Sequence, residues 1–140
     1  MVESGIIDSA DIVVVVDANR SQYVHLLDAS NRNGKQSWHL FGTGRAVLRV
    51  MAPQSLLRVA PFDPVQPPKS LWLINTELPD MSGFDLVQML RPNLAGATSV
   101  LIGSQYILEE EIAARRCGAT MYLCQPLSRN MFEMKGDTLT

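Results

Sequence analysis

The sequence predicts an α/β fold in which one parallel sheet is covered by helices on both faces. The run Ile12–Val16 is aliphatic at every position, as in a strand that is buried on both sides. Similar short apolar runs recur along the chain, and amphipathic stretches with helix start and stop signals follow them. A chain of 140 residues is long enough to bury one core, so a single domain is expected.

The amino-terminal half supplies the first two strand–helix units. Residues 1–9 are expected to form a tail, and the domain is expected to occupy residues 10–140. The expected elements are a strand at Ile12–Val16, a helix at Ser21–Ala29, a strand at Ser37–Phe41 and a helix at Arg45–Ala52. Ser21 is the expected N-cap of the first helix, and Val24 and Leu27 lie one turn apart on its apolar face.

A proline-rich segment separates the two halves of the chain. Five of the eight prolines fall between Pro53 and Pro68. Because proline fixes φ and lacks an amide donor, this segment cannot be a regular helix or a central strand. It predicts an insertion at about residues 53–69, in the connection to the third strand.

The carboxyl-terminal half completes the pattern with three more units. Ser82 and Asp85 have the spacing of a helix start, and Gly118 is a helix C-cap. Glu111 and Arg115 have the spacing of a stabilising pair on one helix. The expected strands are Leu71–Ile74, Ser99–Ile102 and Thr120–Cys124, and the expected helices begin at Ser82, Leu108 and Ser128. Five such units predict a five-stranded, doubly wound, three-layer sandwich with flavodoxin-like strand order.

Composition excludes several functional classes. A net charge of −2 and a pI near 5.6 give no electrostatic footprint for nucleic acid or for an anionic membrane surface. The longest aliphatic run has five residues, which is too short to span a bilayer, and residues 1–5 lack the basic start of a signal peptide. Two cysteines do not make a disulfide framework. A cytoplasmic protein without nucleic-acid or membrane partners is expected.

The residues that follow the predicted strands are mostly polar. They are Asp17 and Ala18 after the first strand, Asn75 after the third, Ser104 after the fourth and Gln125 after the fifth. In a doubly wound sheet these carboxyl ends form the usual ligand site. A single fixed carboxylate is too little for Mg²⁺, which dehydrates reluctantly, so neither a metal nor another cofactor is expected.

Two segments of the chain resemble receiver domains, the phosphorylatable modules of two-component response regulators. They are Leu78-Pro79-x-Met81-x-Gly83 and Gly118-Ala119-x-x-Tyr122-x-x-Gln125-Pro126, and the resemblance extends over residues 10–133. It implies a receiver-type fold. It also implies a site where an acidic pair holds magnesium beside an acceptor aspartate, a hydroxyl and a lysine.

The same resemblance implies that this site has lost its chemistry. The acceptor position holds Asn75, and an amide oxygen is too poor a nucleophile to form an acyl phosphate. The second acid is replaced by Ala18 and the lysine by Gln125, whereas Asp17 and Ser104 remain. An uncharged hydrogen-bonded pair of Asn75 and Gln125 near Ser104 is predicted. The chain is therefore identified as a degenerate receiver, or pseudo-receiver.

The favoured function is a phosphorylation-independent protein-interaction module in bacterial two-component or phosphorelay signalling, without enzymatic activity. A sensor kinase or an output protein is the expected partner, and a homodimer is left open. The resemblance implies a docking face that includes Glu109, Arg116, Tyr122 and Met131. In receivers, the aromatic residue at the position of Tyr122 swings inward or outward with phosphorylation.

Two other functions are weighed against this one. In the first, the chain is an atypical response regulator phosphorylated on a displaced carboxylate, such as Glu77 or Asp80 in the loop after Asn75. In the second, it is a flavin carrier or a hydrolase. The loop Asp17-Ala18-Asn19-Arg20 lacks the Ser, Thr and Gly residues that cradle a phosphate, and the chain has no Gly-x-Ser-x-Gly elbow.

Overall fold

The computed structural model describes residues 6–24, 26, 36–51, 69–93 and 97–132. Five parallel strands form one sheet in the order β2-β1-β3-β4-β5, which is the predicted flavodoxin-like order. The strands are β1 (Ile12–Val16), β2 (Ser37–Phe41), β3 (Ser70–Asn75), β4 (Thr98–Gly103) and β5 (Met121–Cys124). The α-helices are α1 (Ile6–Ser9), α3 (Gly44–Met51), α4 (Gly83–Leu90) and α5 (Leu108–Cys117). Short 3₁₀ helices are η1 (Ser21–Tyr23), η3 (Arg91–Asn93) and η4 (Arg129–Phe132).

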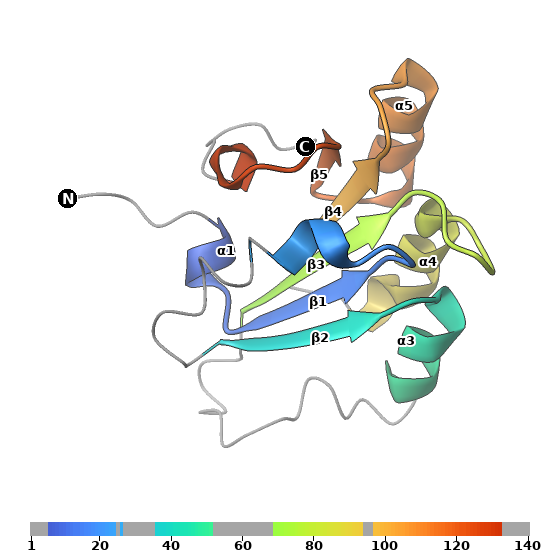
Figure 1. Ribbon diagram of the computed structural model, residues 1–140. Helices are drawn as coiled ribbons and strands as arrows, with labels where there is room; N and C mark the ends of the chain where they lie inside the picture. Colours follow the sequence, from blue (N-terminus) through green and yellow to red (C-terminus); the bar gives the residue numbers. More distant parts are fainter. Residues whose placement is uncertain (1–5, 25, 27–35, 52–68, 94–96, 133–140) are drawn as a thin grey trace.

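The sheet is the middle of three layers, as the sequence predicts (Figure 1). Side chains of α3, α4 and α5 pack against one face of the sheet, where they form one core cluster. Side chains of α1, η1 and η4 pack against the other face and form a second cluster. Because both faces are covered, apolar runs without alternation become central strands.

Strand β1 illustrates why the strands could be found from the sequence. Val14 and Val16 point into the cluster beneath α3 and α4, whereas Val13 and Val15 point into the opposite cluster. All four side chains are completely buried. The β1 and β2 boundaries agree with the prediction. Strands β3 and β4 are each one residue longer than predicted at both ends, and β5 begins one residue later than predicted.

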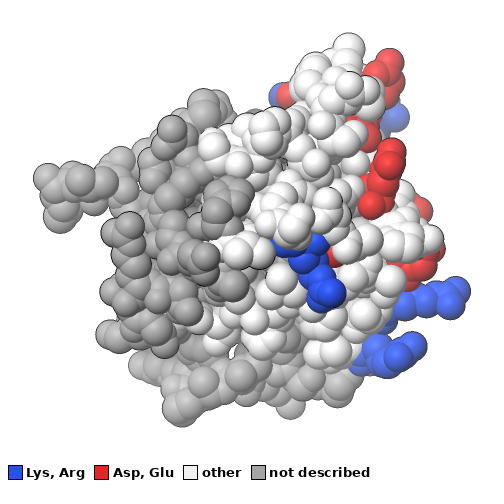
Figure 2. Space-filling view, in the orientation of Figure 1, with Lys and Arg blue, Asp and Glu red and all other residues white. Residues whose placement is uncertain are grey.

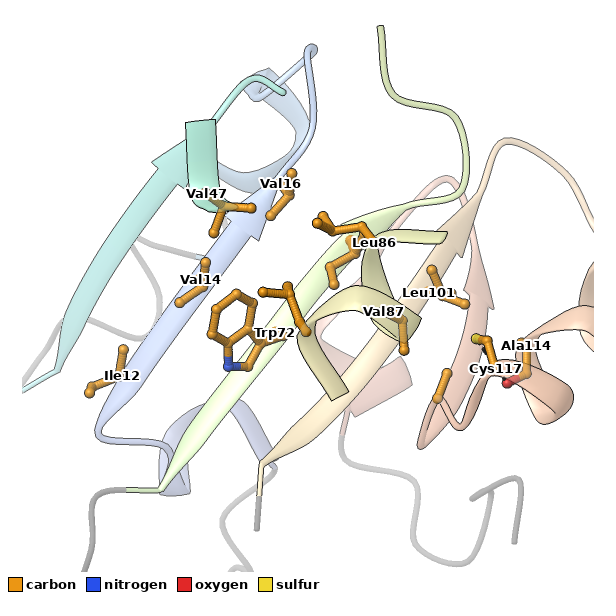
Figure 3. Close-up of a cluster of buried hydrophobic side chains, with 13 residues drawn as sticks. Ile12, Val14, Val16, Val47, Trp72, Leu86, Val87, Leu101, Ala114 and Cys117 are labelled. Carbon is orange, nitrogen blue, oxygen red and sulfur yellow. Dashed lines mark hydrogen bonds between the residues drawn. The ribbon is translucent and has the colours of Figure 1, made fainter. Parts of the chain in front are cut away.

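Trp72 belongs to the core cluster that lies between the sheet and the helices α3, α4 and α5. Its indole lies between Val14 of β1 and the side chains Leu86 and Val87 of α4 (Figure 3). It is fully buried, and its Nε1 atom has no hydrogen-bond partner among the described residues. Its burial therefore rests on apolar contact alone.

The helices follow the predicted local signals in three places. The Ser82 hydroxyl accepts a hydrogen bond from the Asp85 amide at 3.1 Å, so it caps α4 as predicted. Gly118 ends α5 with a φ of 92°, a backbone conformation that favours glycine. Glu111 and Arg115 form the expected pair, with 3.6 Å between their charged atoms.

The first predicted helix is wrong in two details. Ser21 is not its N-cap; instead, the Asn19 side chain accepts hydrogen bonds from the Ser21 amide and hydroxyl. Val24, predicted on the apolar face, is 53% exposed, and the buried side chains are Tyr23 and Leu26. The helix is rotated because Tyr23 reaches a buried polar partner, described below. The predicted Leu27 lies outside the described residues.

The two ends of the chain and the insertion differ from the prediction or lie partly outside the described residues. Part of the predicted tail forms α1, and Ile7 is buried in the core at 1% exposure. The proline-rich insertion lies outside the described residues except for Lys69, and the last predicted helix is described only as η4. None of the helices in the described part of the chain is long and apolar enough to span a bilayer.

Candidate functional site

Asp17 is the centre of a buried polar cluster at the carboxyl end of β1. Its side chain is only 3% exposed. It accepts four hydrogen bonds, from the Asn19 amide (2.9 Å), Gln22 Nε2 (3.0 Å), the Tyr23 hydroxyl (2.8 Å) and Asn75 Nδ2 (3.0 Å). A buried carboxylate without a cation needs such donors, because it has lost its hydration. Asp17 is thus held at the strand end by one backbone donor and three side-chain donors.

Tyr23 is the most buried of these donors, at 1% exposure. Burial raises the pKa of its hydroxyl, and the neighbouring Asp17 carboxylate raises that pKa further. The phenol is therefore protonated at physiological pH and donates permanently to Asp17. Sequence reasoning assigned no role to Gln22 or Tyr23. Their signal was the placement of two polar donors five and six residues after a strand-end aspartate.

Asn75 uses both ends of its amide. Its Nδ2 atom donates to Asp17, and its Oδ1 atom accepts from the Glu77 amide at 2.8 Å. The predicted pair of Asn75 and Gln125 is therefore wrong, and no hydrogen bond joins these side chains in the part of the chain that the structure describes. An ionised aspartate in place of Asn75 could not donate to Asp17. The site is built around an amide at this position.

The turn after β3 holds Asn75 tightly. A Cβ atom at Gly83 would lie 2.1 Å from the Asn75 carbonyl oxygen, so only glycine fits there. The Gly83 amide also donates to the Thr76 carbonyl at 2.8 Å. The Leu-Pro-x-Met-x-Gly motif therefore fixes the backbone on which the Asn75 side chain is displayed.

Two of the remaining predicted site residues line an open depression of about 370 Å³. Ser104 and Gln125 line it together with Gln22, Pro126 and Leu127. Ala18 is exposed beside Asp17 and is not among the lining residues. All five lining residues are uncharged. Among the described residues, no three His, Cys, Asp or Glu side chains are grouped closely enough to hold a metal ion.

Hydrogen bonds connect the Tyr122 side chain to the start of α5. Its hydroxyl donates to Glu110 Oε1 at 2.6 Å, lies 3.2 Å from the Gln105 carbonyl, and accepts from the Ile107 amide at 3.3 Å. Burial raises the pKa of this hydroxyl, and the hydrogen bond to Glu110 adds to the rise. A Cβ at Gly103 would lie within 3.0 Å of both partners of the short bond. The pair therefore depends on a glycine at the end of β4.

The four residues of the expected docking face are distributed over three surfaces. Glu109 and Arg116 line a groove between α4 and α5. Tyr122 lies on the edge strand β5 and packs against the cluster beneath α4 and α5. Met131 of η4 packs against the cluster on the other face of the sheet. The sequence could not show this distribution, because it depends on how each helix is rotated.

The two candidate displaced acceptors lie in the loop after β3. Glu77 is exposed and forms an isolated β-bridge with Ser82. Asp80 accepts hydrogen bonds from the Gly44 amide (2.9 Å) and the Arg45 amide (2.8 Å). It therefore occupies the amino-terminal end of α3, where a negative charge is favourable.

Replacing Asp80 with alanine should destabilise the protein at neutral pH. The bond from the Gly44 amide is the main reason that the pKa of Asp80 lies below its ordinary value of 3.8. A lowered folded-state pKa means that Asp80 stabilises the fold above pH 3.8, and that this contribution is lost as the pH falls through the lower value. Urea unfolding of wild type and Asp80→Ala should differ at pH 7, and the difference should shrink as the pH falls below 3.8. Equal urea midpoints at pH 7 would contradict a capping role.

No protein-family model matches the sequence, and no curated protein matches it either. Solved structures do. The chain is similar to the beryllofluoride-activated NtrC4 receiver domain, with a TM-score of 0.66, 19% identity, and coverage of 87% of this chain and 89% of that one. It is also similar to a CheY-like receiver domain from Methanospirillum hungatei, with a TM-score of 0.63, 18% identity, and coverage of 89% and 90%.

A third similar structure is the receiver domain of a Luxo repressor protein from Vibrio parahaemolyticus. Its TM-score is 0.65 at 16% identity, and the match covers 87% of this chain and 83% of that one. Identities this low establish the fold. The structural neighbours of this chain are response-regulator receiver domains, and its fold is the CheY-like, flavodoxin-like receiver fold.

Proposed function

We propose that this chain is a pseudo-receiver: a protein-interaction module of two-component signalling that works without phosphorylation and has no catalytic activity. The receiver fold supports the signalling role. One observation carries the loss of phosphorylation, namely the 3.0 Å hydrogen bond from the Asn75 amide to the buried Asp17 carboxylate. It ties the residue at the acceptor position to the acid that a receiver uses for its metal.

The surroundings of this bond disfavour phosphoryl chemistry. A phosphoryl group needs a metal ion and an ammonium group to spread its charge. Asp17 is turned inward, with all of its described partners acting as donors, and the residue beside it is Ala18. Gln125 supplies a neutral amide where the receiver resemblance implies a lysine. Neither requirement is met by the residues at this end of the sheet.

A fixed conformation on the α5 side fits the same function. Tyr122 is held by Glu110 and by the backbone at Gln105 and Ile107. A hydrogen bond between a phenol and a carboxylate is short and strong, so it holds the first turn of α5 against β5 without any added group. We therefore expect a partner, such as a sensor kinase or an output protein, to bind a surface whose shape does not depend on phosphate.

The proposal predicts that the site ignores magnesium and beryllofluoride, the acyl-phosphate mimic. Amide NMR spectra recorded with Mg²⁺, and then with Mg²⁺ and beryllofluoride, should leave the resonances of residues 17, 75, 104 and 125 unchanged. The control is the Ala18→Asp, Asn75→Asp, Gln125→Lys variant, which restores the receiver ligand set. In that variant, Mg²⁺ should shift these resonances.

Two outcomes would contradict the proposal. Movement of the wild-type resonances, with Tyr122 following, would make the domain a working switch. A phosphoryl group found by intact-mass measurement after incubation with acetyl phosphate, and lost in Glu77→Gln or Asp80→Asn, would establish a displaced acceptor. The two carboxylates are tested separately, since Asp80 also caps α3.

A further inference from the structure

A groove of about 500 Å³ runs between α4 and α5. Phe84, Ala113 and Cys117 line its inner part, and all three are at least half-buried. Ile112 stands on its rim at 41% exposure. Covering an open apolar groove and an exposed isoleucine removes apolar surface from water, which lowers the free energy.

Charge changes sign along this groove. Asp85 and Glu109 line it near the amino-terminal ends of α4 and α5. Arg116 lines it near the carboxyl-terminal end of α5, and the Arg91 guanidinium lies beside Gly118. Both helices follow parallel strands, so both begin at the same edge of the sheet. The groove therefore has one acidic end and one basic end.

Glu109 and Arg116 are the unpaired charges of α5. Both are exposed, and the described residues give neither side chain a hydrogen bond or an ion pair. Their neighbours on the helix are engaged elsewhere: Glu110 binds Tyr122, and Glu111 binds Arg115 and Tyr106. Figure 2 shows acidic and basic atoms together over the region of α5. Charge complementarity on this helix is therefore available to another molecule.

We propose that the occupant of this groove is a second copy of the same chain, related by a two-fold axis through the middle of α5. Glu109 and Arg116 are seven residues apart, which is about two turns and roughly 10 Å along the helix. An antiparallel neighbour then places Glu109 opposite the partner's Arg116 and Arg116 opposite the partner's Glu109. The same register brings Ile112 over the partner's Ala113, at the apolar centre of the groove.

This arrangement is self-complementary, as a two-fold interface requires, because one chain carries both charges at matched spacing. It leaves the Tyr122 surface on the other side of α5 free, so it does not depend on the proposed signalling function. A contact of one helix and its groove is small, so we expect a weak dimer whose population rises with protein concentration.

Sedimentation of charge-reversal variants tests the proposal. Wild type should show a concentration-dependent dimer. Glu109→Arg or Arg116→Glu places like charges together at both ends of the interface, so each should raise the dissociation constant about tenfold or more. The double variant E109R/R116E exchanges the two charges, keeps the net charge, and should restore the wild-type value. Arg49→Glu, an exposed reversal on α3, should leave the dimer unchanged.

The result of each variant decides the question. Rescue by the exchange supports the proposed pairing, since a charge effect on some other surface would not be reversed by it. A wild-type monomer at all concentrations overturns the proposal and leaves the groove for a different protein. A dimer that Glu109→Arg does not weaken also overturns it, because the interface must then lie elsewhere. Circular dichroism of each variant checks that the fold is intact.

Discussion

Replacing Trp72 with alanine should lower the free energy of unfolding by about 3–5 kcal/mol. Trp72 is the largest completely buried side chain, and it lies on β3 at the middle of the sheet. Removing the indole leaves a cavity between Val14 and the α4 side chains Leu86 and Val87, which the surrounding strands cannot fill by small movements. A loss of this size is a large part of the stability of an ordinary domain. Denaturant unfolding measures it directly.

Trp72→Phe is the matched control for this prediction. It also leaves a smaller side chain, but it removes the indole N–H, which is buried with no hydrogen-bond partner in the part of the chain that the structure describes. Burying an unpaired donor costs free energy, so its loss offsets part of the cavity cost. We expect Trp72→Phe to be destabilised much less than Trp72→Ala. Equal losses for both variants would show that shape at this position matters more than the unpaired donor.

The fold could be predicted because burial on both faces leaves a strong local pattern. Val13, Val14 and their neighbours on β1 are all apolar since helices cover both sides of the strand. The helix ends at Ser82 and Gly118 were also local, because a cap is set by residues within one turn. Such features need no knowledge of distant contacts.

The Asp17 cluster could be predicted only in part. The sequence placed Asp17 and Asn75 at neighbouring strand ends, and the structure joins them. It could not show which donor each carboxylate oxygen would take, and the Asn75–Gln125 pair was wrong for this reason. Tyr23 was missed because its contact with Asp17 rotates the helix away from the face that hydrophobic periodicity favoured. A tertiary polar contact therefore overrode a local pattern.

Replacing Asn75 with aspartate should destabilise the protein on the order of 3 kcal/mol at pH 8. The new carboxylate would lie at hydrogen-bond distance from the buried Asp17 carboxylate, in the place of a donor that is now 3.0 Å away. Two such groups repel, and no cation is available among their described partners. The acceptor residue of a receiver would thus weaken this fold, although it differs from Asn75 by a single group.

The pH dependence of Asn75→Asp separates charge repulsion from the simple loss of a hydrogen bond. Repulsion raises the pKa of the carboxylate pair in the folded state, so one shared proton binds more tightly there than in the unfolded chain. The free energy of unfolding should therefore fall as the pH rises from 5 to 8. Asn75→Ala loses the same donor without adding a charge, so its deficit relative to wild type should stay constant over this range.

Restoring a counter-charge completes the test of the Asn75 site. In the double variant Asn75→Asp, Gln125→Lys, the ammonium group supplies the cation that the pair lacks, so much of the lost stability should return at pH 8. Gln125→Lys alone should stabilise the protein much less, because the single carboxylate of Asp17 already has four hydrogen-bond donors in the wild-type site. If Asn75→Asp were as stable as wild type at pH 8, Asp17 would not need the Asn75 amide. In that case, the rest of the site would still accept an aspartate at position 75.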